Sequence, residues 1–289
     1  MDKTPREHLG YLYVIASAAM FGLMPLFTKI AYRYGSDPYT VSFMRFFFTF
    51  LVSGIIILCT PQMSFRVTAY EMKWIAIISV IYATIPLTLY GSYTFIDSSL
   101  ASALHFAYPV VVMLLSVVVL HTKLNTKQVL CAVICMSGVA LLTQTSGGGS
   151  MLGAVMALAS GVSYALYVVL LTKSGLQDMP KITMVFWLSV YTGAYLLVFT
   201  VVTGKLNLAL PLQAHLAHFL LAACSTMFAI VLFQKGMVII GGVRATLLST
   251  FEPLVSVLVG IVVFHEALTV RIAAGIALIL ASAVLLVKE

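Results

Sequence analysis

The sequence predicts an all-α membrane protein with ten transmembrane helices, arranged as two inverted five-helix repeats. Composition is the first reason, and an internal repeat and the count of apolar segments are the others. Hydrophobic residues make up 62% of the chain and charged residues only 9%, whereas soluble domains are about 45–50% apolar and about 25% charged. Because water cannot solvate such a surface, we expect the lipid bilayer to surround this chain.

A phrase that occurs twice reveals the internal repeat. Tyr108-Pro109 is followed ten residues later by residues 119–124 (VLHTKL), and Glu252-Pro253 is followed at the same distance by residues 263–268 (VFHEAL). The two prolines lie 144 positions apart (253 − 109), close to half of the 289 residues. A duplicated apolar bundle with a proline in matching helices is typical of secondary transporters.

The apolar segments can be taken in order, because about 20 consecutive apolar residues span the hydrocarbon core as a helix. The expected spans are residues 10–33, 38–59, 71–95, 98–120, 127–144, 151–173, 181–203, 213–235, 242–264 and 269–287. The connections are too short for an extramembrane domain. We expect one five-helix repeat over residues 1–146 and a second over 147–289, with Gly147-Gly148-Gly149 at the boundary. Since each repeat has an odd number of helices, the second is inverted relative to the first.

The distribution of basic residues predicts the orientation, because lysine and arginine are enriched on the cytoplasmic side. With a cytoplasmic N-terminus, that side holds Lys3, Arg6, Arg66, Lys73, Lys123, Lys127, Lys173, Lys181, Lys235, Arg244 and Lys288. The outer side holds Lys29, Arg33, Lys205 and Arg271. The eleven basic residues on the cytoplasmic side, against four on the outer side, favour an orientation with both termini in the cytoplasm.

Several phrases carry a family resemblance that covers almost the whole chain. They are residues 98–103 (SSLASA) leading to Pro109, residues 242–249 (GVRATLLS) leading to Glu252-Pro253, and residues 264–269 (FHEALT). With them the chain resembles the drug/metabolite transporter superfamily, specifically its EamA-domain exporters. The first half departs at Thr122, where the family usually has the glutamate seen here as Glu266.

The resemblance implies a central cavity, alternating access and small organic substrates. We therefore expect a secondary transporter that moves small metabolites, above all amino acids or related compounds, out across a bacterial-type cytoplasmic (inner) membrane. A flippase or carrier of larger or lipid-linked metabolites, and an uptake permease of the same fold, stay open as alternatives. Proton coupling is also left open, as is the choice between a monomer and a homodimer.

Glu252 is the sharpest candidate for chemistry. It stands ten residues into the expected ninth span, roughly 15 Å deep at 1.5 Å per residue. A carboxylate near the midplane is costly unless it is paired, protonated or wetted, so it can contact a substrate amine, carry a proton or bond to a neighbouring helix. Pro109 and Pro253 each remove a helix hydrogen bond and are candidate hinges.

Further candidates for the cavity are aromatic or ionisable residues within the apolar segments. The expected substrate-binding residues are His105, Tyr108, Glu252, Tyr164, Tyr90, Phe21 and Tyr82. Arg45, seven residues into the second span, can contact an anionic group, pair with Asp37 or Asp97, or extend toward the membrane surface.

Other functional classes are not supported by the sequence. It contains no HExxH, P-loop or GxSxG motif, so we expect no enzyme, no cofactor and no metal site. The net charge of +7 does not indicate nucleic-acid binding, because the basic residues stand singly at the ends of apolar segments. Transport would be driven by gradients of the substrate or of an ion.

Overall fold

The fold was analysed in a computed structural model that describes residues 5–96, 101, 104–142, 150–264 and 269–287. Within these ranges every regular element is a helix. The expected repeat boundary at residues 146–147 lies outside the described residues, and so do Asp97 and Glu266.

The first half of the chain begins with a helix that is broken once. Its helices are α1 (Pro5–Gly22), α2 (Met24–Arg33), α3 (Pro38–Cys59), α4 (Ala69–Ser92), α6 (Tyr108–Leu120) and α7 (Thr126–Leu142). The span expected at residues 10–33 corresponds to α1 and α2, which lie within a single stretch, Glu7–Arg33, that is long and apolar enough to cross a membrane. Pro25 lies in the first turn of α2, where its missing N–H costs nothing, and the helix is therefore divided at Leu23.

The second half of the chain contains α-helices, one short 3₁₀ helix and one π-helix. They are α8 (Met151–Lys173), the 3₁₀ helix η1 (Leu176–Asp178), α9 (Lys181–Val202), α10 (Leu212–Ala222), the π-helix η2 (Ala223–Phe228), α11 (Ala229–Ile240), α12 (Gly242–Leu248), α13 (Phe251–Phe264) and α14 (Val270–Val287). The span expected to end at residue 235 continues to Ile240. It stops at Gly241, whose φ of 84° and ψ of 156° are accessible essentially to glycine alone.

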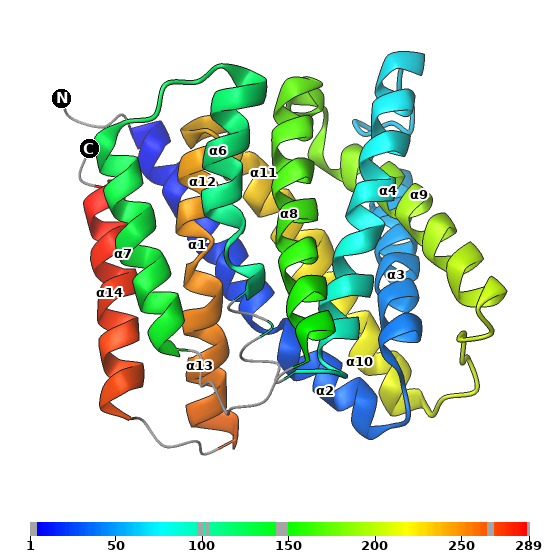
Figure 1. The fold of residues 1–289 in the computed structure, drawn as a ribbon. Coiled ribbons are helices and arrows are strands. Elements are labelled where there is room, and N and C mark those ends of the chain that lie inside the picture. The colour runs from blue at the N-terminus through cyan, green and yellow to red at the C-terminus, as the bar shows by residue number, and fades with distance from the viewer. Residues whose placement is uncertain (1–4, 97–100, 102–103, 143–149, 265–268, 288–289) are drawn as a thin grey trace.

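Helices from the two halves pack against one another throughout the bundle (Figure 1). α7 packs on α14, α3 on α9, α1 on α11, and α4 on α8. The beginning of α1, the end of α14 and the connection between α6 and α7 lie at the same end of the bundle.

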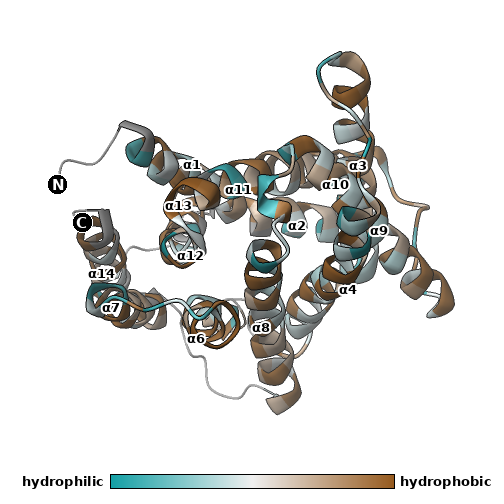
Figure 2. Cartoon of the chain, turned by 90° about the horizontal axis from the view of Figure 1, so that it is seen from above, coloured by the Kyte–Doolittle hydropathy of each residue, from teal (hydrophilic) through white to brown (hydrophobic). Residues whose placement is uncertain are grey.

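The outer surface of the bundle is apolar, as a lipid-facing surface must be. Large side chains exposed on the outside of helices include Leu58 (75%), Val118 (70%) and Val202 (80%). Six helical stretches in the described residues are long and apolar enough to cross a membrane, and shorter apolar helices accompany them. Figure 2 shows the hydrophilic colour on the connection between α6 and α7, while hydrophobic colours cover much of the helices around the edge.

Candidate functional site

A small cavity lies inside the bundle. Its walls come from the α1–α2 region, α3, α4, α8, and the segments at the beginnings of α6 and α13. The lining residues are Phe21, Met24, Arg45, Phe46, Tyr82, Ile85, Pro86, Leu89, Tyr90, His105, Tyr108, Tyr164 and Glu252. The sequence-predicted residues therefore meet in one place, although they come from helices far apart in the chain.

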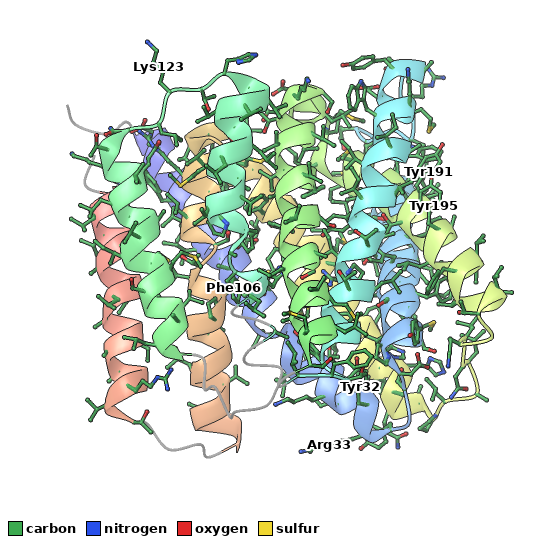
Figure 3. All side chains as sticks on the ribbon, viewed as in Figure 1. Tyr32, Arg33, Phe106, Lys123, Tyr191 and Tyr195 are labelled. Atoms are coloured by element: carbon green, nitrogen blue, oxygen red, sulfur yellow. The ribbon has the colours of Figure 1, made fainter. Side chains whose placement is uncertain are left out.

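Two helix breaks form one side of this cavity. Turns at Phe106–Ala107 and at Ser249–Thr250 interrupt the helices just before α6 and α13. Each candidate hinge proline stands in the first turn after a break, where a missing N–H disturbs few helical bonds. In Figure 3, Phe106 lies between Lys123 near one end of the bundle and Arg33 at the other, so the first break is well inside the bundle.

The two breaks are tied to each other and to α8 by side-chain hydrogen bonds. The Tyr108 hydroxyl and the Ser249 hydroxyl are 2.8 Å apart, joining the two halves of the chain. His105 Nδ1 lies 2.8 Å from Ser160 Oγ on α8. These bonds hold the imidazole and the phenol in place at the cavity wall.

Glycine permits the backbone of α8 to approach the first break. A Cβ built on Gly161 would stand 2.6 Å from the His105 carbonyl oxygen, closer than any ordinary contact. This carbonyl is the one that Pro109 leaves without its helical N–H partner. The absence of a side chain at Gly161 thus allows close approach of α8 to the first break.

Aromatic rings form a continuous wall across three helices and the first break. Ring contacts run in sequence through Phe46, Tyr82, Tyr167, Tyr164, Tyr108 and His105. Successive ring centroids are 5.7, 4.6, 5.8, 4.6 and 5.4 Å apart. Tyr167 supports this wall from behind, and its hydroxyl accepts a 3.2 Å hydrogen bond from Gln234. The rings are tilted or edge-on, as aromatic pairs prefer.

Arg45 is buried, with 6% of its side chain exposed, and the protein itself occupies most of its donors. Nε donates to Thr226 Oγ1, and Nη2 donates one hydrogen to the Ser225 carbonyl at 3.0 Å. Nη1 donates to Tyr90 OH and to Met24 Sδ, both at 3.1 Å. Two of these partners belong to the π-helix η2, a type of helical irregularity that occurs frequently at functional sites.

Glu252 is partly buried and faces the same cavity. In the part of the chain that the structure describes, its carboxylate accepts no hydrogen bond, whereas its backbone N–H donates to the Ser249 carbonyl at 3.0 Å. The carboxylate and the Arg45 guanidinium are thus the opposite charges of one cavity, and no salt bridge joins them. Asp37, considered as a partner of Arg45, instead caps α3 by accepting bonds from the Tyr39 and Thr40 N–H groups.

Several lining residues were missed at the level of sequence. They are Met24, Phe46, Ile85, Pro86 and Leu89. Pro86 carried a signal that could have found it, because it interrupts the hydrogen bonding of an otherwise regular apolar helix. Among the described residues no cluster of three His, Cys, Asp or Glu side chains could hold a metal ion. The thiol of Cys135 instead donates a hydrogen bond to Thr250 Oγ1.

Comparisons with known proteins agree with this architecture. The EamA-like transporter family matches residues 8–144 and again residues 151–288. An uncharacterised transporter of Archaeoglobus fulgidus is 26% identical over an alignment of 288 residues, and the match covers 97% of this chain and 97% of that protein. A crystal structure described only as that of a protein shares the fold, with a TM-score of 0.78, 17% identity, and coverage of 96% of this chain and 95% of that chain. With its apolar helices and two matching stretches, this integral membrane protein belongs to the EamA-like transporter family.

Proposed function

We propose that this protein is a secondary transporter that exports small metabolites, most fittingly amino acids or related compounds, by alternating access. The observation that carries the proposal is the cavity within the bundle, which combines the Glu252 carboxylate with an aromatic wall. Sites for small molecules are mostly apolar with a few placed polar groups, and the lining of this cavity has that character.

Opposite charges and rings together suit a compact polar molecule with an apolar side chain. Glu252 offers a negative group, and Tyr82, Tyr108 and Tyr164 offer ring faces and hydroxyls. Charged groups inside a membrane protein generally mark substrate or ion pathways. Amino acids combine the required small size, charge and apolar side chain, whereas a lipid-linked metabolite would have to extend well beyond the cavity.

The helix packing supports an inverted repeat as the basis of alternating access. If the five spans of each half correspond in order, exchanging the halves turns the α1–α11 contact into the α8–α4 contact. The same exchange turns the α3–α9 and α7–α14 contacts into themselves. Pro109 and Pro253 occupy equivalent breaks in the two halves, where small backbone rotations can open the cavity to either side.

The ends of the bundle support an orientation with both termini in the cytoplasm. The start of α1, the end of α14 and Lys123 lie at one end, and Arg33 lies at the other (Figure 3). That division matches the excess of basic residues expected on the cytoplasmic side.

Transport in proteoliposomes tests the proposal. Vesicles loaded with one unlabelled amino acid should accumulate the labelled form transiently by counterflow, because a carrier exchanges substrate through one site. Glu252→Gln should abolish this exchange, and Glu7→Gln, which changes a carboxyl outside the cavity, should leave it intact. A purified, folded protein that exchanges no metabolite from a broad panel would refute the proposal, and uptake without efflux in oriented vesicles would favour the permease alternative.

A further inference from the structure

We infer that the cavity anchors its substrate by the ammonium group at Glu252 and does not require a substrate carboxylate. Primary organic amines with an aromatic or branched apolar side chain are then substrates in addition to amino acids. This inference rests on the proposed transport function and concerns the chemistry by which the same cavity selects its substrate.

The first step is that Arg45 is unavailable as a carboxylate anchor. A guanidinium has five N–H donors and binds a carboxylate best through two parallel bonds. Four of the donors of Arg45 go to Thr226, Tyr90, Met24 and Ser225. One hydrogen on Nη2 remains, so no adjacent pair of donors is left for bidentate binding.

The bonds of Arg45 also give it a clear structural task. They connect α3 to α2, to α4 and to the π-helix, at positions separated by 21, 45 and 180–181 residues along the chain. Breaking these bonds to bind a carboxylate would leave buried acceptors unpaired, which is unfavourable. A substrate anion would therefore have to displace bonds that hold α3 to three other helical elements.

The second step is that the Glu252 carboxylate, unlike the Arg45 guanidinium, is available to a ligand. Its carboxylate faces the cavity without a hydrogen-bond donor from the described residues. A carboxylate in the membrane interior needs a partner. An ammonium group of a metabolite can be this partner, because it carries a positive charge and three N–H donors.

The third step is that aromatic rings share the cavity with the Glu252 carboxylate. Tyr108 follows the first break and packs on Tyr164 with ring centroids 4.6 Å apart and planes inclined at 59°. Both rings line the same cavity as Glu252, together with Tyr82. Ring faces attract cations within about 6 Å of the centroid, so these tyrosines add to the carboxylate in favouring a cation over an anion.

A series of three ligands that differ in one group tests the inference. We would measure binding of phenylalanine, 2-phenylethylamine and 3-phenylpropanoate to the purified protein in detergent by isothermal titration calorimetry, and exchange of each in proteoliposomes. The amine, which lacks the carboxylate, should bind within about tenfold of the amino acid. The acid, which lacks the ammonium group, should bind about 30-fold more weakly or worse.

Variants identify the anchoring group. Glu252→Gln should weaken both the amine and the amino acid by about 30-fold or more, whereas Glu7→Gln should not change either affinity. If Glu252→Gln fails to fold, the ligand series on the unaltered protein still decides the matter.

The outcomes separate this inference from the proposed function. Binding of the acid and the amino acid but not of the amine would overturn the inference and leave amino-acid transport standing. Transport of other metabolites with no binding of the amine would likewise overturn it. Absence of transport for every compound in a broad panel would instead overturn the proposed function.

Discussion

Replacing Gly161 by alanine should distort the cavity through a single added methyl group. The Cβ would lie 2.6 Å from the carbonyl oxygen of His105, and this oxygen belongs to the backbone and has no freedom to rotate away. A carbon normally approaches a carbonyl oxygen to about 3.3–3.6 Å. The methyl group would therefore push α8 and the first helix break apart by about 0.7 Å, the difference between 3.3 and 2.6 Å.

Two opposing effects set the size of the change in stability. Alanine in a helix interior is favoured over glycine by about 0.5–1 kcal/mol, whereas forcing extra atoms into a packed interior costs about 1–3 kcal/mol. The second effect should win at Gly161 because the contact is with backbone. We expect Gly161→Ala to lower the free energy of unfolding by about 1–2 kcal/mol.

Gly193→Ala provides the matched control. Gly193 lies within α9, and a Cβ there would stand 3.6 Å from the Cβ of Phe46, an ordinary contact. We expect this variant to be unchanged or more stable by up to about 1 kcal/mol. Unfolding of both variants would be followed by circular dichroism in mixed detergent–SDS micelles. The reasoning is refuted if Gly161→Ala proves as stable as Gly193→Ala.

The remaining predictions concern hydrogen bonds around the bundle. Tyr108→Phe and Ser249→Ala should each lower the free energy of unfolding by about 1 kcal/mol. The double variant should lose less than the sum of the two losses. Full additivity in the same unfolding assay would contradict a direct bond between the two hydroxyl groups. Asp37→Ala should cost about 1 kcal/mol through loss of the α3 cap, and Asp37→Asn should cost much less; equal losses would argue against capping. Trp187→Phe should cost about 1 kcal/mol because its indole N–H donates to the Phe65 carbonyl at 2.9 Å; an unchanged unfolding curve would contradict this.

Much of the helical organisation was predictable, because the solvent of this chain imposes a simple pattern. Apolar segments of about 20 residues must form helices in a bilayer, since every backbone N–H and C=O group has to be bonded within the segment. The expected spans at 38–59 and 151–173 match α3 and α8 to the residue. The span expected at residues 10–33 lies within one apolar stretch of the structure, Glu7–Arg33, but the turn at Leu23 inside it was not predicted, because Pro25 lies within a continuous apolar segment.

The candidate site was predictable for one kind of residue and not for another. Ionisable and aromatic side chains within apolar segments stand out in a sequence, and the selected residues, including His105, Tyr164 and Glu252, do line one cavity; their role in binding substrate stays a prediction. Met24 and Phe46 also line it, but nothing in their local sequence distinguishes them from residues that face lipid. A helix has two apolar sides in a membrane, and composition does not say which one faces inward.

The sequence by itself determined that the chain spans a membrane in helices, that its two halves repeat, and that each half carries a proline at an equivalent place. These properties follow from apolar length and from proline chemistry, which are local. Only the tertiary structure decided that donors of Arg45 are taken by Thr226 and Tyr90, while the carboxylate of Glu252 faces the cavity and accepts no hydrogen bond from the described residues. Thr226 is 181 residues from Arg45 in the chain, and a hydrogen bond of this kind depends on which helices become neighbours.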